Sequence, residues 1–131
     1  MNEATRVRSY RDLKVWSKGM EFAELVYGIA KQMPREERYG LTSQMLRSAA
    51  TVPANVAEGY QRGTRRDYAN FIGIARGSLA ETETHLLLAA RVGLLSADVI
   101  APALACADEL SRMLRALRAR LIPTERPRHE P

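Results

Sequence analysis

Apolar residues recur every three or four positions in three stretches of the chain, which is the spacing of one face of a helix and does not fit a strand. The first stretch comprises Leu13, Trp16, Met20, Ala23, Tyr27 and Ala30. The second comprises Tyr68, Ile72, Ala75, Leu79, Thr82, Leu86 and Ala89. The third comprises Leu110, Leu114, Leu117 and Leu121, preceded by Ile100 and Leu104. These patterns predict helices over residues 12–33, 65–92 and 96–121.

Residues that favour helix ends flank these stretches. Pro34 ends the first helix, because the residue before a proline is driven out of the α region. Thr64 with Asp67 resembles a capping box at the start of the next helix, and Gly93 fits the left-handed residue at its end. Ser96 suits the N-cap of the last helix. Pro102 falls too late for a first turn, so that helix is either bent there or begins near residue 101.

A further helix, the second along the chain, is predicted between the links at residues 34–40 and around 63. Three kinds of residue lie on its faces. Its polar stripe falls within an arc of about 80° and comprises Arg47, Thr51, Asn55, Glu58 and Arg62. The opposite side carries Met45, Ala49, Val52, Val56 and Tyr60. A third edge of small residues, Ala50, Pro53, Ala54 and Ala57, predicts a close crossing with Gly73, Gly77 and Ala80 of the following helix. Pro53 predicts a kink.

Short links between the four helices make neighbouring helices antiparallel. The sequence therefore predicts an all-α fold, an antiparallel up-down-up-down four-helix bundle with a kinked second helix. The chain of 131 residues is expected to form one domain over residues 1–121, followed by a proline-containing, charged tail over 122–131. Residues predicted to lie in or beside the core are Leu13, Trp16, Met20, Leu79, Leu86, Leu110, Leu114 and Leu117.

Composition removes several classes of protein. No run of about 18 apolar residues predicts a membrane span, and the N-terminus lacks the apolar stretch of a secretory signal, so a cytoplasmic location is expected. One cysteine and two histidines cannot assemble a Cys/His zinc site. No phosphate-binding loop, serine-hydrolase elbow or zinc-protease motif occurs. We therefore predict no catalytic residue, no metal and no cofactor, with His85 as a structural residue.

The net charge of +5 and the isoelectric point of about 9.8 make an anionic partner plausible. Basic residues cluster near the start, in a predicted turn and near the end: Arg6, Arg8, Arg11 and Lys14; Arg62, Arg65 and Arg66; and Arg112, Arg115, Arg118 and Arg120. One hypothesis is RNA or DNA binding, with phosphates contacted by Arg11, Lys14, Arg62, Arg65 and Arg66. Only Tyr10, Tyr39 and Tyr60 are left for stacking on bases. The alternatives are a solubilising surface and an oligomeric scaffold for another protein.

The polar stripe of the second helix is open to three interpretations: a solvated outer face, a subunit interface or an internal polar network. The residues concerned are Arg47, Asn55, Glu58 and Arg62. Glu58 lies among alanines, where an unpaired buried carboxylate would cost several kcal/mol. Arg62 follows four residues later and can reach it along the helix. We favour an interface or a network over an active site.

Three strings carry a resemblance to a known family: YRDLKVW at 10–16, QMLRSAATVPANVAEGYQR at 44–62 and FIGIARGSLAETETHL at 71–86. They resemble the 23S rRNA intervening-sequence proteins over about residues 8–121. The resemblance implies a four-helix bundle that assembles as a homopentamer and has a poorly defined task. More distantly, the chain is similar to the accessory variability determinant of diversity-generating retroelements, a basic pentameric bundle that binds a reverse transcriptase and nucleic acid. That similarity supports the nucleic-acid hypothesis.

Overall fold

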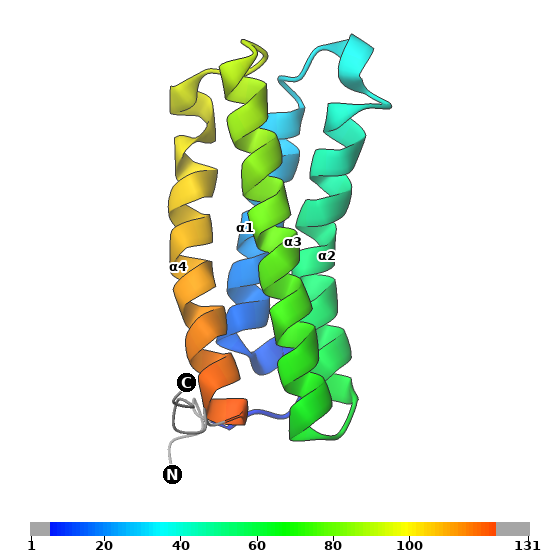
Figure 1. Ribbon diagram of the computed structural model, residues 1–131, viewed down its shortest axis with the longest axis vertical. Helices are drawn as coiled ribbons and strands as arrows, with labels where there is room; N and C mark the ends of the chain where they lie inside the picture. The colour runs from blue at the N-terminus through cyan, green and yellow to red at the C-terminus, as the bar shows by residue number, and fades with distance from the viewer. Residues whose placement is uncertain (1–5, 123–131) are drawn as a thin grey trace, which may run out of the picture.

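The computed structural model describes residues 6–122 and contains four long helices that run alternately up and down (Figure 1). They are α1 (Lys14–Ala30), α2 (Leu41–Gln61), α3 (Arg65–Arg91) and α4 (Ala97–Leu121). Short 3-10 turns, η2 (Tyr10–Asp12) and η3 (Arg35–Glu37), precede α1 and α2. No strand occurs within residues 6–122. The predicted all-α four-helix bundle is confirmed.

The helix ends follow the capping residues, with two departures. The Thr64 hydroxyl accepts a hydrogen bond from Asp67 N, and Gly93 has a φ of 83°. α1 is shorter than predicted, because Leu13 is extended and the chain leaves the helix before Pro34. α4 begins at Ala97 and continues through Pro102, so the alternative of a start near residue 101 is wrong.

Two other predictions about the chain stay predictions. α2 continues as a helix through Pro53, and the kink there stays a prediction. Apart from Ile122, the predicted tail over 122–131 lies outside the described residues.

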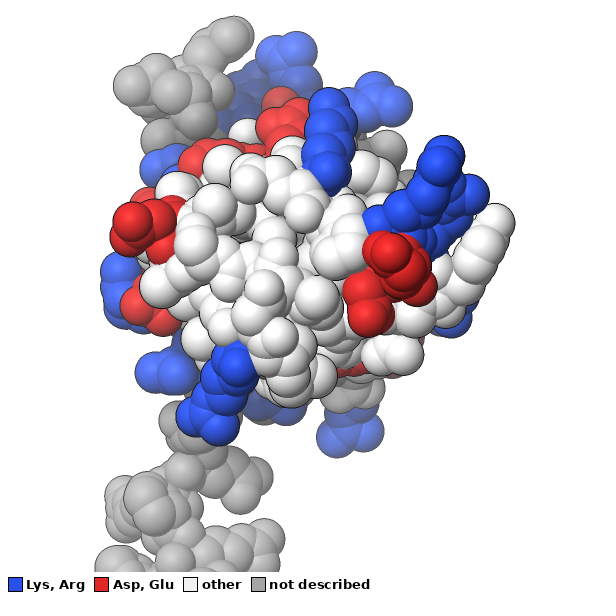
Figure 2. All heavy atoms as spheres, turned by 90° about the horizontal axis from the view of Figure 1, so that it is seen from above, with Lys and Arg blue, Asp and Glu red and all other residues white. Residues whose placement is uncertain are grey.

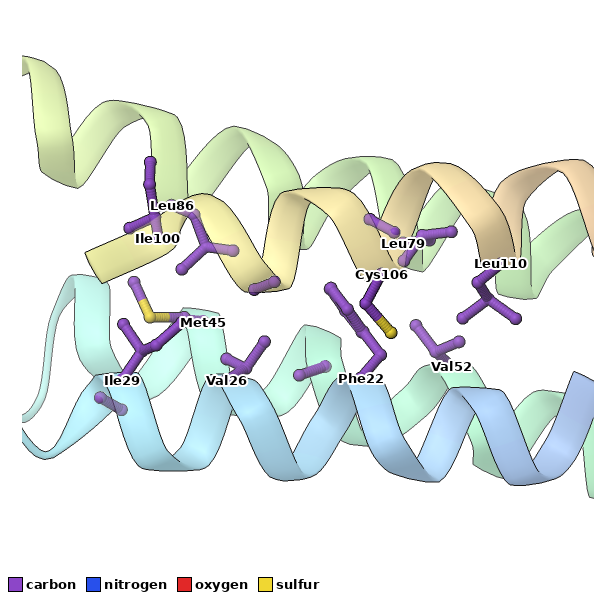
Figure 3. Packing of buried hydrophobic residues seen from close by; sticks show 14 of the residues in the cluster. Phe22, Val26, Ile29, Met45, Val52, Leu79, Leu86, Ile100, Cys106 and Leu110 are labelled. Carbon is purple, nitrogen blue, oxygen red and sulfur yellow. The ribbon is translucent and has the colours of Figure 1, made fainter. Parts of the chain in front are cut away.

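The core runs along the axis of the bundle and contains one buried face of each helix (Figure 3). Leu79, Leu86, Leu110 and Leu114 are buried as predicted, while Leu13, Trp16 and Leu117 are half-buried against the core. Met20 is exposed, so its assignment to the core was wrong. α1 instead buries Val15, Gly19, Phe22, Val26 and Ile29. This face is rotated from the predicted one, which lies beside α2.

The predicted crossing of small residues between α2 and α3 was also wrong. Ala50 and Ala54 are exposed, and a Cβ at Gly77 would meet nothing within 4 Å. The close approach to α3 is made at Gly59, where a Cβ would lie 2.6 Å from Phe71 Cβ. α1 and α2 are in contact at Gly19, where a Cβ would lie 3.4 Å from Pro53 Cβ. Ala50 and Pro53 therefore border α1, and Ala54 lies at the surface, instead of packing on α3.

Candidate nucleic-acid interface

The three basic clusters, far apart in sequence, meet at one end of the bundle, apart from Arg112, which lies further up α4. The start of α1, the α2–α3 turn and the end of α4 all lie at this end (Figure 1). We define the basic end as residues 6–14, 58–68 and 115–122. It holds ten basic residues, Arg6, Arg8, Arg11, Lys14, Arg62, Arg65, Arg66, Arg115, Arg118 and Arg120, against three acidic ones, Asp12, Glu58 and Asp67.

The rest of the described chain has almost no net charge. Outside the basic end, residues 6–122 hold eight basic and nine acidic residues. Figure 2 views the opposite end of the bundle, which is mostly uncharged with both signs at its rim. The excess of positive charge is therefore concentrated at one end, although the sequence distributes it over the whole chain.

The first part of the basic end is built by a capped turn. Ser9 Oγ accepts from Arg11 N at 3.1 Å, and Asp12 Oδ2 accepts from the backbone N–H groups of Arg8 and Ser9 at 2.9 and 3.2 Å. The carboxylate of Asp12 is thus directed at the backbone. The Arg11 guanidinium lies 5.5 Å from the centre of the Tyr10 ring. Arg11 and Lys14 are both exposed.

The α2–α3 turn supplies the second part. The Nε atom of Arg62 lies 3.4 Å from Glu58 Oε2, the pair that the four-residue spacing predicts, and its guanidinium covers the Phe71 ring at 4.9 Å. Gly63 has a φ of 95°, a conformation that glycine adopts without strain, and it reverses the chain before Thr64. Arg66, in the first turn of α3, is exposed.

Arg65 has a structural contact that sequence reasoning missed. Its Nε donates to the carbonyl of Leu121 at 3.1 Å, and its Nη2 donates to the carbonyl of Arg120. A cation at a helix C-terminus satisfies carbonyls that have no partner within the helix. Arg65 therefore ties the start of α3 to the end of α4. No signal in the sequence pairs residues so far apart.

Aromatic rings at the basic end are engaged with one another. Tyr10 and Trp16 meet edge to face at 5.5 Å, and Tyr60 and Tyr68 at 5.8 Å. Burial, with a smaller effect of Tyr60, raises the pKa of Tyr68, and Arg120 opposes the shift. All four rings are half-buried. Tyr39 is exposed, as expected, but it lies in the α1–α2 link at the opposite end.

The residues predicted to form an interface or a polar network do not gather into one cluster. Glu58 and Arg62 pair with each other, whereas Asn55 Nδ2 donates to the carbonyl of Thr51 on its own helix at 2.7 Å. Arg47 is exposed and lies near the other end of α2. Their role at a subunit interface stays a prediction.

An internal polar network exists elsewhere, between α2 and α3. Thr82 Oγ1 donates to Ser48 Oγ at 2.7 Å, and Ser48 Oγ lies 3.4 Å from His85 Nδ1. His85 Nε2 lies 4.0 Å from Glu81 Oε2. Ser48, Thr82 and His85 are buried, which agrees with a structural role for His85. The sequence placed Thr82 on the apolar face but gave no sign of Ser48 as its partner.

The described residues contain no group of three or more His, Cys, Asp or Glu side chains that could hold a metal ion. Cys106 is buried, and burial raises the pKa of its thiol. Within residues 6–122, none of the helices has the length and apolar character that a membrane span needs.

Fold and charge together define a small four-helix-bundle protein with one strongly basic end. A family model described as 23S rRNA-intervening sequence protein matches residues 11–116, and the chain belongs to this family. It is also similar to a solved structure from Bacteroides thetaiotaomicron, described as a protein of unknown function from the S23 ribosomal protein family. The two share 27% identity with a TM-score of 0.72, over 84% of this chain and 99% of that one. No curated protein matches the chain.

Proposed function

We propose that this protein is a non-enzymatic, cytoplasmic, oligomeric bundle whose basic end binds the backbone of RNA or DNA. The observation that carries the proposal is the meeting of three separate arginine clusters at one end, with ten basic against three acidic residues. Clustered Lys and Arg side chains neutralise phosphates and release counterions, which is the main source of sequence-independent binding. Of the acidic residues there, Asp12 and Glu58 already have partners within the chain.

The contacts expected at this end are phosphate contacts. Stacking of bases needs aromatic faces that are open to solvent, and the rings here are half-buried and paired. Phosphate contacts position a nucleic acid without reading its sequence. We therefore propose weakly selective, salt-sensitive binding, with Arg11, Lys14 and Arg66 as principal contacts. Arg62 and Arg65 contribute charge while their side chains also hold the α2–α3 turn and the end of α4.

Oligomerisation belongs to the same proposal. The resemblance to the intervening-sequence proteins suggests five copies, and a basic end repeated in one assembly lets one strand contact several copies. Because the second contact is then intramolecular, modest affinities combine. A protein partner is the alternative, in which the arginines only solubilise the assembly. Exposed apolar side chains away from the basic end favour it, among them Tyr27 and Ile74.

The test compares two triple variants with the same net charge. Arg11→Gln/Lys14→Gln/Arg66→Gln removes three cations from the basic end, and Arg35→Gln/Arg38→Gln/Arg91→Gln removes three from the opposite end. All six side chains are exposed. Binding to a labelled single strand and a labelled duplex of RNA is measured by fluorescence anisotropy, between about 50 and 200 mM salt.

In the basic-end variant, the negative slope of log affinity against log salt is expected to become shallower by about 2 to 3. Each lost phosphate contact reduces the magnitude of this slope by about 0.7 to 0.9. The opposite-end variant should bind like the wild type. Equal losses in both variants would mean that net charge acts and not a site. Absence of binding by the wild type at low salt would reject the nucleic-acid function and favour the protein scaffold.

A further inference from the structure

A groove of about 560 Å³ lies between α1 and α2 and is lined mainly by apolar residues. They are Met20, Ala23, Tyr27, Ala50 and Pro53, with Glu24 and Lys31 also in the lining. Met20 is 38% exposed and Tyr27 49%. This is the apolar stretch of α1 that the sequence assigned to the core. A second apolar face on one helix needs a second partner, because a single bundle core covers only one.

A row of exposed positions, most of them apolar, runs along α3. We call it the α3 line, and it comprises Ile74, Gly77, Glu81, Leu88 and Val92. Ile74, Leu88 and Val92 are 50%, 46% and 60% exposed. Gly77 and Glu81 lie between them at helical spacing and are exposed. Ile74 and Leu88 each follow by three residues one that faces α2, since Phe71 contacts Gly59 and His85 contacts Ser48. The line therefore lies on the outer side of α3 next to α2.

The groove and the line are different surfaces on neighbouring sides of α2. A surface that pairs with a different surface of the next copy makes a heterologous contact, which closes into a ring or continues as a filament. Gly77 leaves open space around it, whereas a larger residue there would hold a neighbouring helix away. Ala50 and Ala54 are likewise small and exposed. Both surfaces thus carry small residues that allow a neighbouring helix to approach closely.

The charges beside the two surfaces are opposite and lie at the same level. Arg47 borders the exposed alanines of α2, and Glu81 lies in the line on α3. Ser48 follows Arg47 in the sequence, and Thr82 follows Glu81. Because Ser48 and Thr82 are hydrogen-bonded to each other, Arg47 and Glu81 lie at the same level along the bundle. In a ring with its axis along the helices, levels are preserved from copy to copy. Glu81 of one copy then meets Arg47 of the next.

We propose that the α1–α2 groove of one copy receives the α3 line of the next copy, with Glu81 beside Arg47. This inference rests on the oligomer of the proposed function and names its contact surfaces. A contact of this kind points every bundle in the same direction. All basic ends therefore lie on one face of the assembly, where one nucleic acid can reach several of them. A two-fold contact between grooves, with its axis across the bundles, would instead point the basic ends in opposite directions.

The test uses two variants, each of which spoils one surface. Ala50→Arg places a long cation in the groove, and Ile74→Arg places one in the α3 line. Both positions are exposed, so the fold is expected to survive, and far-UV circular dichroism checks this. Ala105→Arg, on the exposed side of α4, is the matched control. Mass is measured by light scattering after size exclusion.

Each variant alone is expected at the protomer mass of 14.7 kDa, and the control at the wild-type mass. An equal mixture of the two variants should give a species of twice the protomer mass, because one intact groove meets one intact line. A mixture that stays at the protomer mass overturns the heterologous pairing. Variants that keep the wild-type mass overturn the surfaces named here while the oligomer stands. A wild type of 14.7 kDa rejects the oligomer itself, and binding by anisotropy still judges the nucleic-acid function separately.

Discussion

α1 carries apolar residues on two faces that meet different surroundings. One face, with Phe22 and Val26, is fully buried in the core. The other, with Met20 and Tyr27, lines the groove beside α2 and is partly exposed. Both faces repeat at helical spacing, and each contains an aromatic ring, Phe22 on the first and Tyr27 on the second. Apolar periodicity therefore identifies faces that seek a partner, but it does not say whether the partner lies in the same chain.

Removing one aromatic ring from each face gives the largest expected difference. Phe22→Ala should cost about 3–5 kcal/mol of unfolding free energy, because the lost ring leaves a cavity in a close-packed core. Tyr27→Ala should change the stability of the single bundle by no more than about 0.5 kcal/mol, since its ring is half exposed. Urea unfolding of both variants, in the Ile74→Arg background to remove association, measures the two costs. Similar costs would contradict the distinction between the faces.

The difference between these faces also explains which features of the fold could be predicted from the sequence. Helix number, direction and most ends follow from local signals such as Thr64, Gly93 and Ser96. The buried face of α1 does not, because Leu13, Trp16, Met20 and Tyr27 form as regular a repeat as Val15, Phe22, Val26 and Ile29. Which repeat turns inward depends on how α1 packs against the other helices, and Gly19 is in contact with Pro53 of α2. A single sequence does not contain that pairing.

The candidate site was predictable in its parts and not in its assembly. Arg11, Lys14, Arg62, Arg65 and Arg66 were identifiable as clusters, and antiparallel topology brings their segments to the same end. The contact of Arg65 with the end of α4 and the pairing of the aromatic rings depend on side-chain geometry between distant segments. Patterns of residues within one short segment of the sequence do not predict such contacts.

Alanine substitutions at two glycines, one buried and one on the outer surface, are expected to change stability by an intermediate amount. Gly59→Ala should cost about 1–3 kcal/mol, because the new methyl group would lie 2.6 Å from Phe71 Cβ and 3.2 Å from the Tyr68 carbonyl oxygen. Gly77→Ala should instead stabilise the bundle by up to about 1 kcal/mol, since nothing lies within 4 Å and alanine favours the helix. Thermal unfolding in the Ile74→Arg background measures whether each variant is less or more stable than the parent protein. Destabilisation by both variants would mean that α3 packs at Gly77 within the chain.

The smallest expected difference compares two hydroxyls on α3, one inside and one outside. Thr82→Val should cost about 1–2 kcal/mol, because it removes the donor to buried Ser48 Oγ at 2.7 Å without changing side-chain shape. Thr84→Val should stay within about 0.5 kcal/mol, since its hydroxyl is exposed and donates only to the Ala80 carbonyl at 2.9 Å.

A double-mutant cycle of Ser48→Ala with Thr82→Val isolates the bond between the two hydroxyls from other effects of each change. We expect a coupling energy of at least about 0.5 kcal/mol, as for residues that share a buried hydrogen-bond network. The same cycle of Ser48→Ala with Thr84→Val should give none, because the Thr84 hydroxyl bonds only to its own helix. Coupling in the first cycle alone would show that the network fixes α2 against α3. That contact sets the common level of Arg47 and Glu81, and it therefore aligns the two outer surfaces of the bundle.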